Sequence, residues 1–158
     1  IGNTKVVTEA EEIEAANQII IIDILRSFVY ERMVTLWGDI PYTEALDITN
    51  INPKYDDALT IYKDLLTRLD SDIAGLNTAH GSFGSADLIY GGDVAMWKMF
   101  ANSLKIKMGV VLSTVDAGLA ESTIQSAMAG AFTSNADNAE FVYLGATPNT
   151  NPLYVDLT

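Results

Sequence analysis

The side chains in this 158-residue chain that could do chemistry are carboxylates, one histidine and a few aromatic rings. There is no cysteine, which excludes thiolate metal ligands, thiol nucleophiles and disulfides within this sequence. His80 is the only histidine, and without a second histidine or a cysteine it is a weak candidate for a metal ligand or a catalytic group. We therefore expect His80 to be an exposed loop residue.

Two groups of acidic residues have positions to which chemistry could be assigned. Asp39 and Glu44 could in principle act as a carboxylate pair in glycoside hydrolysis, but acids are so abundant here that such a pair is expected by chance. The second group, with its neighbouring asparagines, consists of Asp47, Asn50, Asn52, Asp56 and Asp57. It lacks the alternate-position spacing and the central glycine of an EF-hand loop, which indicates a solvated acidic loop. We predict no metal site, no cofactor and no enzymatic activity.

Three aromatic residues fall in expected loops, outside the helical stripes: Tyr42, Phe83 and Tyr90. A loop aromatic either packs back onto the core or offers its face to a flat ligand, such as the C–H face of a sugar. These three residues are our candidates for ligand binding.

The charge balance excludes some partners. Nine Lys and Arg against 21 Asp and Glu give a net charge of -12, and Lys107 is the last basic residue. Such a surface repels phosphate backbones and anionic lipid headgroups, so nucleic acid is not an expected partner. The longest aliphatic run covers residues 19–22, whereas a membrane span needs about 20 apolar residues.

The elements that must position these side chains are helices. The apolar fraction of 49% is enough for a folded core, and the fold class we predict is mainly α with little strand. Apolar periodicity and capping residues predict four helices and one short strand. The helices cover residues 8–37, 56–76, 93–115 and 116–132, with a loop at 39–55 and the strand at 141–144.

The third predicted helix should anchor the core. Its stripe is Trp97, Phe100, Leu104, Met108 and Val111, with Lys98, Asn102 and Lys105 on the opposite face. We expect the stripe to pack on Leu25 and Phe28 and on the face formed by Tyr62, Leu65 and Leu69. In the fourth helix, Leu119, Ile124, Ala127, Met128 and Ala131 should face inward.

The first predicted helix is apolar nearly all round between residues 19 and 36. Thr8 and Glu11 match a capping box, and Gly38 stands where a left-handed residue ends a helix. Asp23 and Arg26 are spaced for an ion pair. Three neighbouring helices cannot cover every face of such a helix, so part of residues 19–33 should contact polypeptide absent from this sequence.

Four segments in order resemble the SusD-like family, in the branch of SusD and RagB homologues. They are L-R-S-F-V-Y-E-R-M-V-T-L-W-G-D-I-P-Y-T-E-A at 25–45, P-K-Y-D-D-A-L-T-I-Y-K-D-L-L-T-R-L-D at 53–70, G-G-D-V-A-M-W-K-M-F-A-N-S-L-K-I-K-M at 91–108, and N-P-L-Y at 151–154. Lys107 stands where many relatives have arginine.

The resemblance implies an outer-membrane lipoprotein of Bacteroidetes-type bacteria, facing the outside of the cell. Such proteins form a lid on a TonB-dependent SusC-like transporter and capture nutrients, mostly oligosaccharides, in polysaccharide utilisation. Their scaffold consists of helix pairs of tetratricopeptide type, and their loops form the binding face. Family chains are longer than this one, so residues 1–158 would be part of a single SusD-like α-helical domain.

Two functions remain open at this stage. The first is nutrient capture without catalysis, beside a SusC-like transporter. The second is a helical-repeat module that binds a protein partner and no glycan. An adjacent transporter gene would favour the first.

Overall fold

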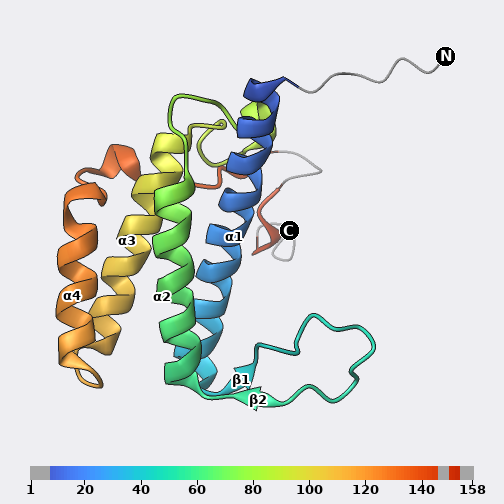
Figure 1. Cartoon of the computed structure of the whole chain (residues 1–158). Coiled ribbons are helices and arrows are strands. Elements are labelled where there is room, and N and C mark those ends of the chain that lie inside the picture. Colours follow the sequence, from blue (N-terminus) through green and yellow to red (C-terminus); the bar gives the residue numbers. More distant parts are fainter. Residues whose placement is uncertain (1–7, 146–149, 154–158) are drawn as a thin grey trace.

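Four helices dominate the computed structural model, which describes residues 8–145 and 150–153 (Figure 1). They are α1 (Glu9–Trp37), α2 (Ala58–Gly75), α3 (Val94–Leu112) and α4 (Ala117–Ala127). Successive helices run in opposite directions; α2 lies between α1 and α3, and α4 covers the other side of α3. The predicted mainly α fold with tetratricopeptide-like helix pairs is confirmed. Within the described ranges, no helix has the length and apolarity needed to cross a membrane.

α1 has the predicted ends. The Thr8 hydroxyl accepts a hydrogen bond from the Glu11 N–H (3.3 Å), and the Glu11 carboxylate accepts one from the Thr8 N–H (2.9 Å), which completes the capping box. Gly38 has φ +75°, as predicted, and its N–H donates to the Val34 carbonyl. Its ψ of -127° lies outside the left-handed helical region, because the chain goes straight into an extended segment.

A short two-stranded ladder follows α1, so the prediction that residues 39–55 are loop throughout is wrong at its ends. β1 (Ile40–Pro41) pairs antiparallel with β2 (Tyr55–Asp56). The Asp56 carboxylate accepts hydrogen bonds from the N–H groups of Tyr42 (3.2 Å) and Thr43 (2.7 Å). Two-residue strands are too short to show the alternation that marks a strand in a sequence. The ladder closes the base of a projecting loop, residues 42–54 (Figure 1).

The core forms where α1, α2 and α3 meet, and most of the predicted stripe is in it. Fully buried, as predicted, are Trp97, Leu104 and Met108 of α3 and Tyr62, Leu65 and Leu69 of α2. Phe100 is half-buried and packs edge-on against Trp97 (5.6 Å between ring centroids) and Phe28 (5.7 Å). The placement of Val111 in the core is wrong: it is exposed and lines an open hollow at the end of α3.

The polar face predicted for α3 is largely buried, because α4 packs on it. Asn102 and Lys105 are both buried, and Lys105 Nζ pairs with Asp70 of α2 and donates to Ser126 Oγ (2.9 Å). Gly109 permits the close approach of α4, since a Cβ there would lie 2.6 Å from Ile124 Cγ1. A sequence stripe cannot reveal a helix with neighbours on two sides.

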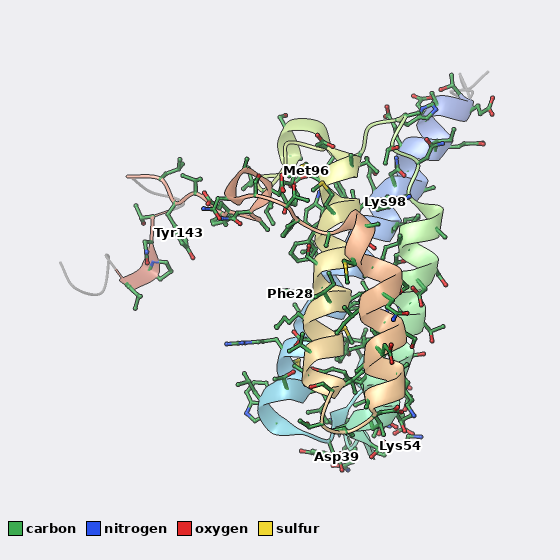
Figure 2. The ribbon with its side chains drawn as sticks, turned by 90° about the vertical axis from the view of Figure 1, so that its left-hand side faces the viewer. Phe28, Asp39, Lys54, Met96, Lys98 and Tyr143 are labelled. Carbon is green, nitrogen blue, oxygen red and sulfur yellow. The ribbon has the colours of Figure 1, made fainter. Side chains whose placement is uncertain are left out.

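The C-terminal third differs from the prediction in two places. α4 ends at Ala127, and a 3₁₀ turn (Met128–Gly130) follows, which leaves Met128 exposed instead of inward. Residues 141–144 form no strand; their side chains are exposed, and the sheet of the described residues consists of β1 and β2 alone. Figure 2 shows this segment, with Tyr143, projecting from the helices.

The predicted ion pair on α1 is present but is not the main contact of its carboxylate. Arg26 Nη1 lies 4.0 Å from Asp23 Oδ1, whereas Arg68 of α2 makes a direct hydrogen bond to the same oxygen. Asp23 therefore ties α1 to α2.

Candidate ligand-binding site

The loop of residues 77–92 joins α2 to α3 at one end of the helices and carries two of the candidate aromatics. Asn17, buried in α1, holds the start of this loop. Its Nδ2 donates to the carbonyls of Asn77 (3.0 Å) and Gly81 (2.9 Å), and its Oδ1 accepts from the Asn77 N–H (2.9 Å). A buried amide with these three bonds fixes the loop against the helix.

Asp87 organises the second half of the loop. Its Oδ1 accepts from the N–H groups of Ile89 (2.9 Å) and Tyr90 (3.2 Å), and its Oδ2 from Gly92 N–H (3.0 Å) and Trp97 Nε1 (2.7 Å). Burial disfavours the charge, but the hydrogen bonds from Trp97 and the backbone outweigh it and lower the pKa of Asp87. The carboxylate is thus ionised and fully used in holding the loop on α3.

Gly92 lets the two halves of the loop touch. Its φ is +87°, and a Cβ at this position would lie 2.5 Å from the backbone nitrogen of Gly84. The loop is therefore a compact unit with little freedom to rearrange.

Phe83 is half-buried at the edge of an apolar hollow of about 290 Å³. The hollow lies between this loop, α1 and the C-terminal segment; its walls include Ile22, Leu25, Trp97 and Phe141. The ring of Phe83 packs against the core and keeps part of its surface open to this hollow.

Tyr90 is also half-buried and packs edge-on against Trp97, with 5.2 Å between ring centroids. Its hydroxyl donates to the Asp137 carbonyl (3.1 Å). Burial, with the nearby charges of Asp137 and Asp87, raises the pKa of Tyr90 to about 12, so the hydroxyl stays protonated.

Tyr42 lies at the opposite end of the helices, beyond the end of α1. Only 8% of its surface is exposed; its ring packs edge-on against Tyr30 (4.8 Å) and its hydroxyl donates to Asp64. Burial and the Asp64 carboxylate raise the pKa of Tyr42. Figure 2 shows how far apart the two ends are: Asp39, three residues before Tyr42, lies at one end and Met96 at the other. The structure thus places Phe83 and Tyr90 in the same loop, although Tyr90 does not line the hollow beside Phe83, and it separates Tyr42 from both.

The other residues with chemical potential have structural contacts. Asp39 Oδ1 accepts from the Ala58 N–H at the start of α2 (2.9 Å), and Glu44 accepts from Asn50 Nδ2 and from the Lys54 N–H. His80 lies in the loop of residues 77–92, as expected, but it is half-buried, so the expectation that it is exposed is wrong. Among the described residues, no group of three or more acidic or histidine side chains is placed to hold a metal ion.

Asp87 is the residue at this site that the sequence reasoning did not single out. The pattern Asp-Leu-Ile-Tyr-Gly-Gly could have indicated it, because an aspartate followed by glycines is typical of a turn in which the carboxylate accepts backbone N–H groups. Its bond to Trp97 is a tertiary contact that spacing does not reveal.

The sequence matches, over residues 1–157, the SusD-like family described as "Starch-binding associating with outer membrane". No curated protein matches it. A SusD homologue from Bacteroides uniformis is 31% identical with a TM-score of 0.78, and the similarity covers 86% of this chain and 28% of that one. A SusD homologue from Parabacteroides distasonis is 33% identical with a TM-score of 0.71, covering 83% of this chain and 26% of that one. A chitin-binding protein is 32% identical with a TM-score of 0.73, covering 81% of this chain and 28% of that one. The chain spans little more than a quarter of these solved chains.

Proposed function

Because the chain belongs to the SusD-like family of outer-membrane-associated starch-binding proteins, we propose that the full-length protein captures a neutral oligosaccharide without catalysis. In this proposal it is lipid-anchored at the extracellular face of the outer membrane and delivers its ligand to a SusC-like TonB-dependent transporter. The observation that carries the proposal is the family match along residues 1–157. The similarity to a solved chitin-binding protein adds to it.

The charge of the chain supports a neutral ligand. A net charge of -12 offers no attraction to an anionic sugar, so we expect a neutral ligand held by stacking and by hydrogen bonds to its hydroxyl groups. Such binding depends little on ionic strength.

The loop of residues 77–92 is our proposed ligand contact. It is held in place by Asn17 and Asp87, and it presents Phe83 beside an apolar hollow. A preorganised loop binds with a smaller entropy cost than a mobile one. Tyr42 has its ring and hydroxyl engaged within the protein, so Phe83 and Tyr90 are the residues to test first.

The test is calorimetry of the full-length protein with starch-type and chitin-type oligosaccharides, at low and high salt. Phe83→Ala and Tyr90→Ala should each weaken binding, by about 10-fold if a stacked ring is lost. Tyr55→Ala is the matched control, because Tyr55 is an exposed aromatic in β2, at the other end of the helices. Thermal melts of each variant separate loss of binding from loss of fold.

Three results would count against parts of the proposal. Glycan binding that neither loop substitution weakens would place the site elsewhere in the full-length protein. Binding that disappears at high salt would argue against a neutral ligand. If no oligosaccharide binds while a protein partner does, the protein is an interaction module.

A further inference from the structure

α1 has two stripes on opposite sides, and the described residues cover only one of them. The covered stripe faces α2 and α3 and contains three polar side chains: Asn17, Ser27 and Glu31. The other stripe, which we call the outer seam, is nearly all apolar; its members are Ile19, Ile22, Arg26, Val29, Met33 and Leu36. Of these, Met33 is half-buried and packs partly against the core. Four of these apolar side chains are between 51% and 69% exposed. The more apolar side of the helix is therefore the uncovered one.

The spacing of the outer seam is that of a helix–helix contact. Its positions advance by three and four residues in alternation, the seven-residue repeat of side chains that interlock with a second helix. The 17 steps from Ile19 to Leu36 correspond to about 26 Å at 1.5 Å per residue, the length of a partner helix of ordinary size. Figure 1 shows α1 at the edge of the helices, with α2 and α3 on its other side.

Arg26, in the middle of the outer seam, lacks part of its hydrogen bonding. Its Nε is buried with no partner among the described residues, and its guanidinium reaches Asp23 only at 4.0 Å. Asp23 is already bonded to Arg68. The buried Nε cannot be reached from outside, but the Arg26 side chain is 38% exposed and its Nη1 lies 4.0 Å from Asp23. Covering this exposed guanidinium without an acceptor would be costly, so the occupant of the seam should bring one, and a carboxylate suits an arginine best.

The rest of the same protein is long enough to supply the cover of the outer seam. Similar solved structures are about three times as long as this chain, which spans 28% of the Bacteroides uniformis homologue and 26% of the Parabacteroides distasonis homologue. Part of the same side is already used within the described residues, since Phe141 lines a hollow together with Ile22 and Leu25. On that side the loop of residues 42–54 also projects, with Leu46, Ile48 and Ile51 exposed (Figure 1).

A second copy of the chain fits the outer seam poorly. Two antiparallel α1 helices paired along it would bring both copies of Arg26 near the centre, where the seam carries no carboxylate to neutralise them. We propose that the outer seam of α1 is an intramolecular interface: in the full-length protein it is covered by an amphipathic helix from outside these 158 residues, with a carboxylate against Arg26. This inference does not depend on the ligand.

Thiol labelling of the full-length protein tests the proposal. Val29→Cys places a small thiol in the outer seam, and Ser71→Cys on the exposed side of α2 is the matched control. The rate of labelling with a maleimide is measured for each variant and divided by its rate in the denatured protein. This normalised rate should be at least ~10-fold slower for Val29→Cys than for Ser71→Cys, at every protein concentration. Should Val29→Cys fail to fold, Ile19→Cys at the start of the seam replaces it.

Three outcomes would overturn the proposal. Equal rates for the two thiols would mean that the seam is open in the full-length protein. Protection that grows with protein concentration would assign the seam to a second copy. Protection that appears only when a transporter protein is added would assign it to that partner.

Discussion

Replacing Trp97 tests the most consequential contact in the molecule, because this side chain joins the core to the loop of the proposed site. Trp97 is only 2% exposed, packs edge-on against two aromatic rings and donates its Nε1–H to Asp87. Trp97→Ala removes both the packing and the hydrogen bond. We expect it to lower the free energy of unfolding by about 3–5 kcal/mol, the usual cost of truncating a buried aromatic.

Trp97→Phe separates the two contributions. It keeps most of the buried ring but removes the hydrogen bond to an ionised carboxylate, which is worth about 1.5–3 kcal/mol. Asp87 Oδ2 retains its bond from the Gly92 N–H, so the cost should lie near the lower end of that range. The loop should loosen even where the core survives, so Trp97→Phe should also weaken any ligand bound at Phe83.

Urea unfolding followed by circular dichroism measures the free energy of unfolding of both variants and of the parent protein. If the dependence of this free energy on urea concentration has the same slope in all three, only stability differs. The reasoning fails if Trp97→Ala costs less than about 1 kcal/mol, because the side chain would then not be buried in solution. It also fails if Trp97→Phe costs as much as Trp97→Ala, since the ring would then contribute nothing.

Two further predictions concern pH and the backbone. Burial and the charge of Asp23 raise the pKa of Asp72 to about 7. Between pH 4 and 7 the native state therefore holds a proton that the unfolded state has released, so the free energy of unfolding falls as pH rises through this range. Asp72→Asn should therefore stabilise more near pH 8 than near pH 5, as shown by urea midpoints; equal effects at both would contradict the assignment. Gly92→Ala should lower stability by roughly 1–3 kcal/mol, because a Cβ would meet the backbone of Gly84 in a left-handed conformation. Gly91→Ala, in the same loop, is its control: φ is also positive (+63°), but a Cβ there meets nothing within 4 Å, so a thermal melt should show the smaller loss.

Family membership could be identified from the sequence because the matching segments carry several constraints at once. The segment around Trp97 combines an N-cap aspartate with an apolar stripe, and the segment ending at Gly38 combines a helix with its stop signal. Both features are local, and the family match over residues 1–157 confirms the identification.

The candidate site was only partly accessible to sequence reasoning. The aromatics could be named, because they stand outside helical stripes. Their distribution over the two ends of the helices could not, since it depends on how the helices alternate in direction. The roles of Asn17 and Asp87 are tertiary: each binds backbone groups that only the folded loop brings within 3.2 Å.

The sequence by itself determined that four helices form and where each begins to within two residues, because caps and periodicity act over a few neighbouring residues. Thr8, Asp57, Asp93 and Asp116 each begin a helix as local chemistry requires. Only the tertiary structure decided which faces are buried. Lys105 is buried under α4, a helix that the sequence predicts but whose position in space it does not give. Val111 is exposed because no described element covers it. The physical reason is that the burial of a side chain depends on which elements lie next to it in space. The apolar stripe of a helix does not show how many other helices pack against that helix.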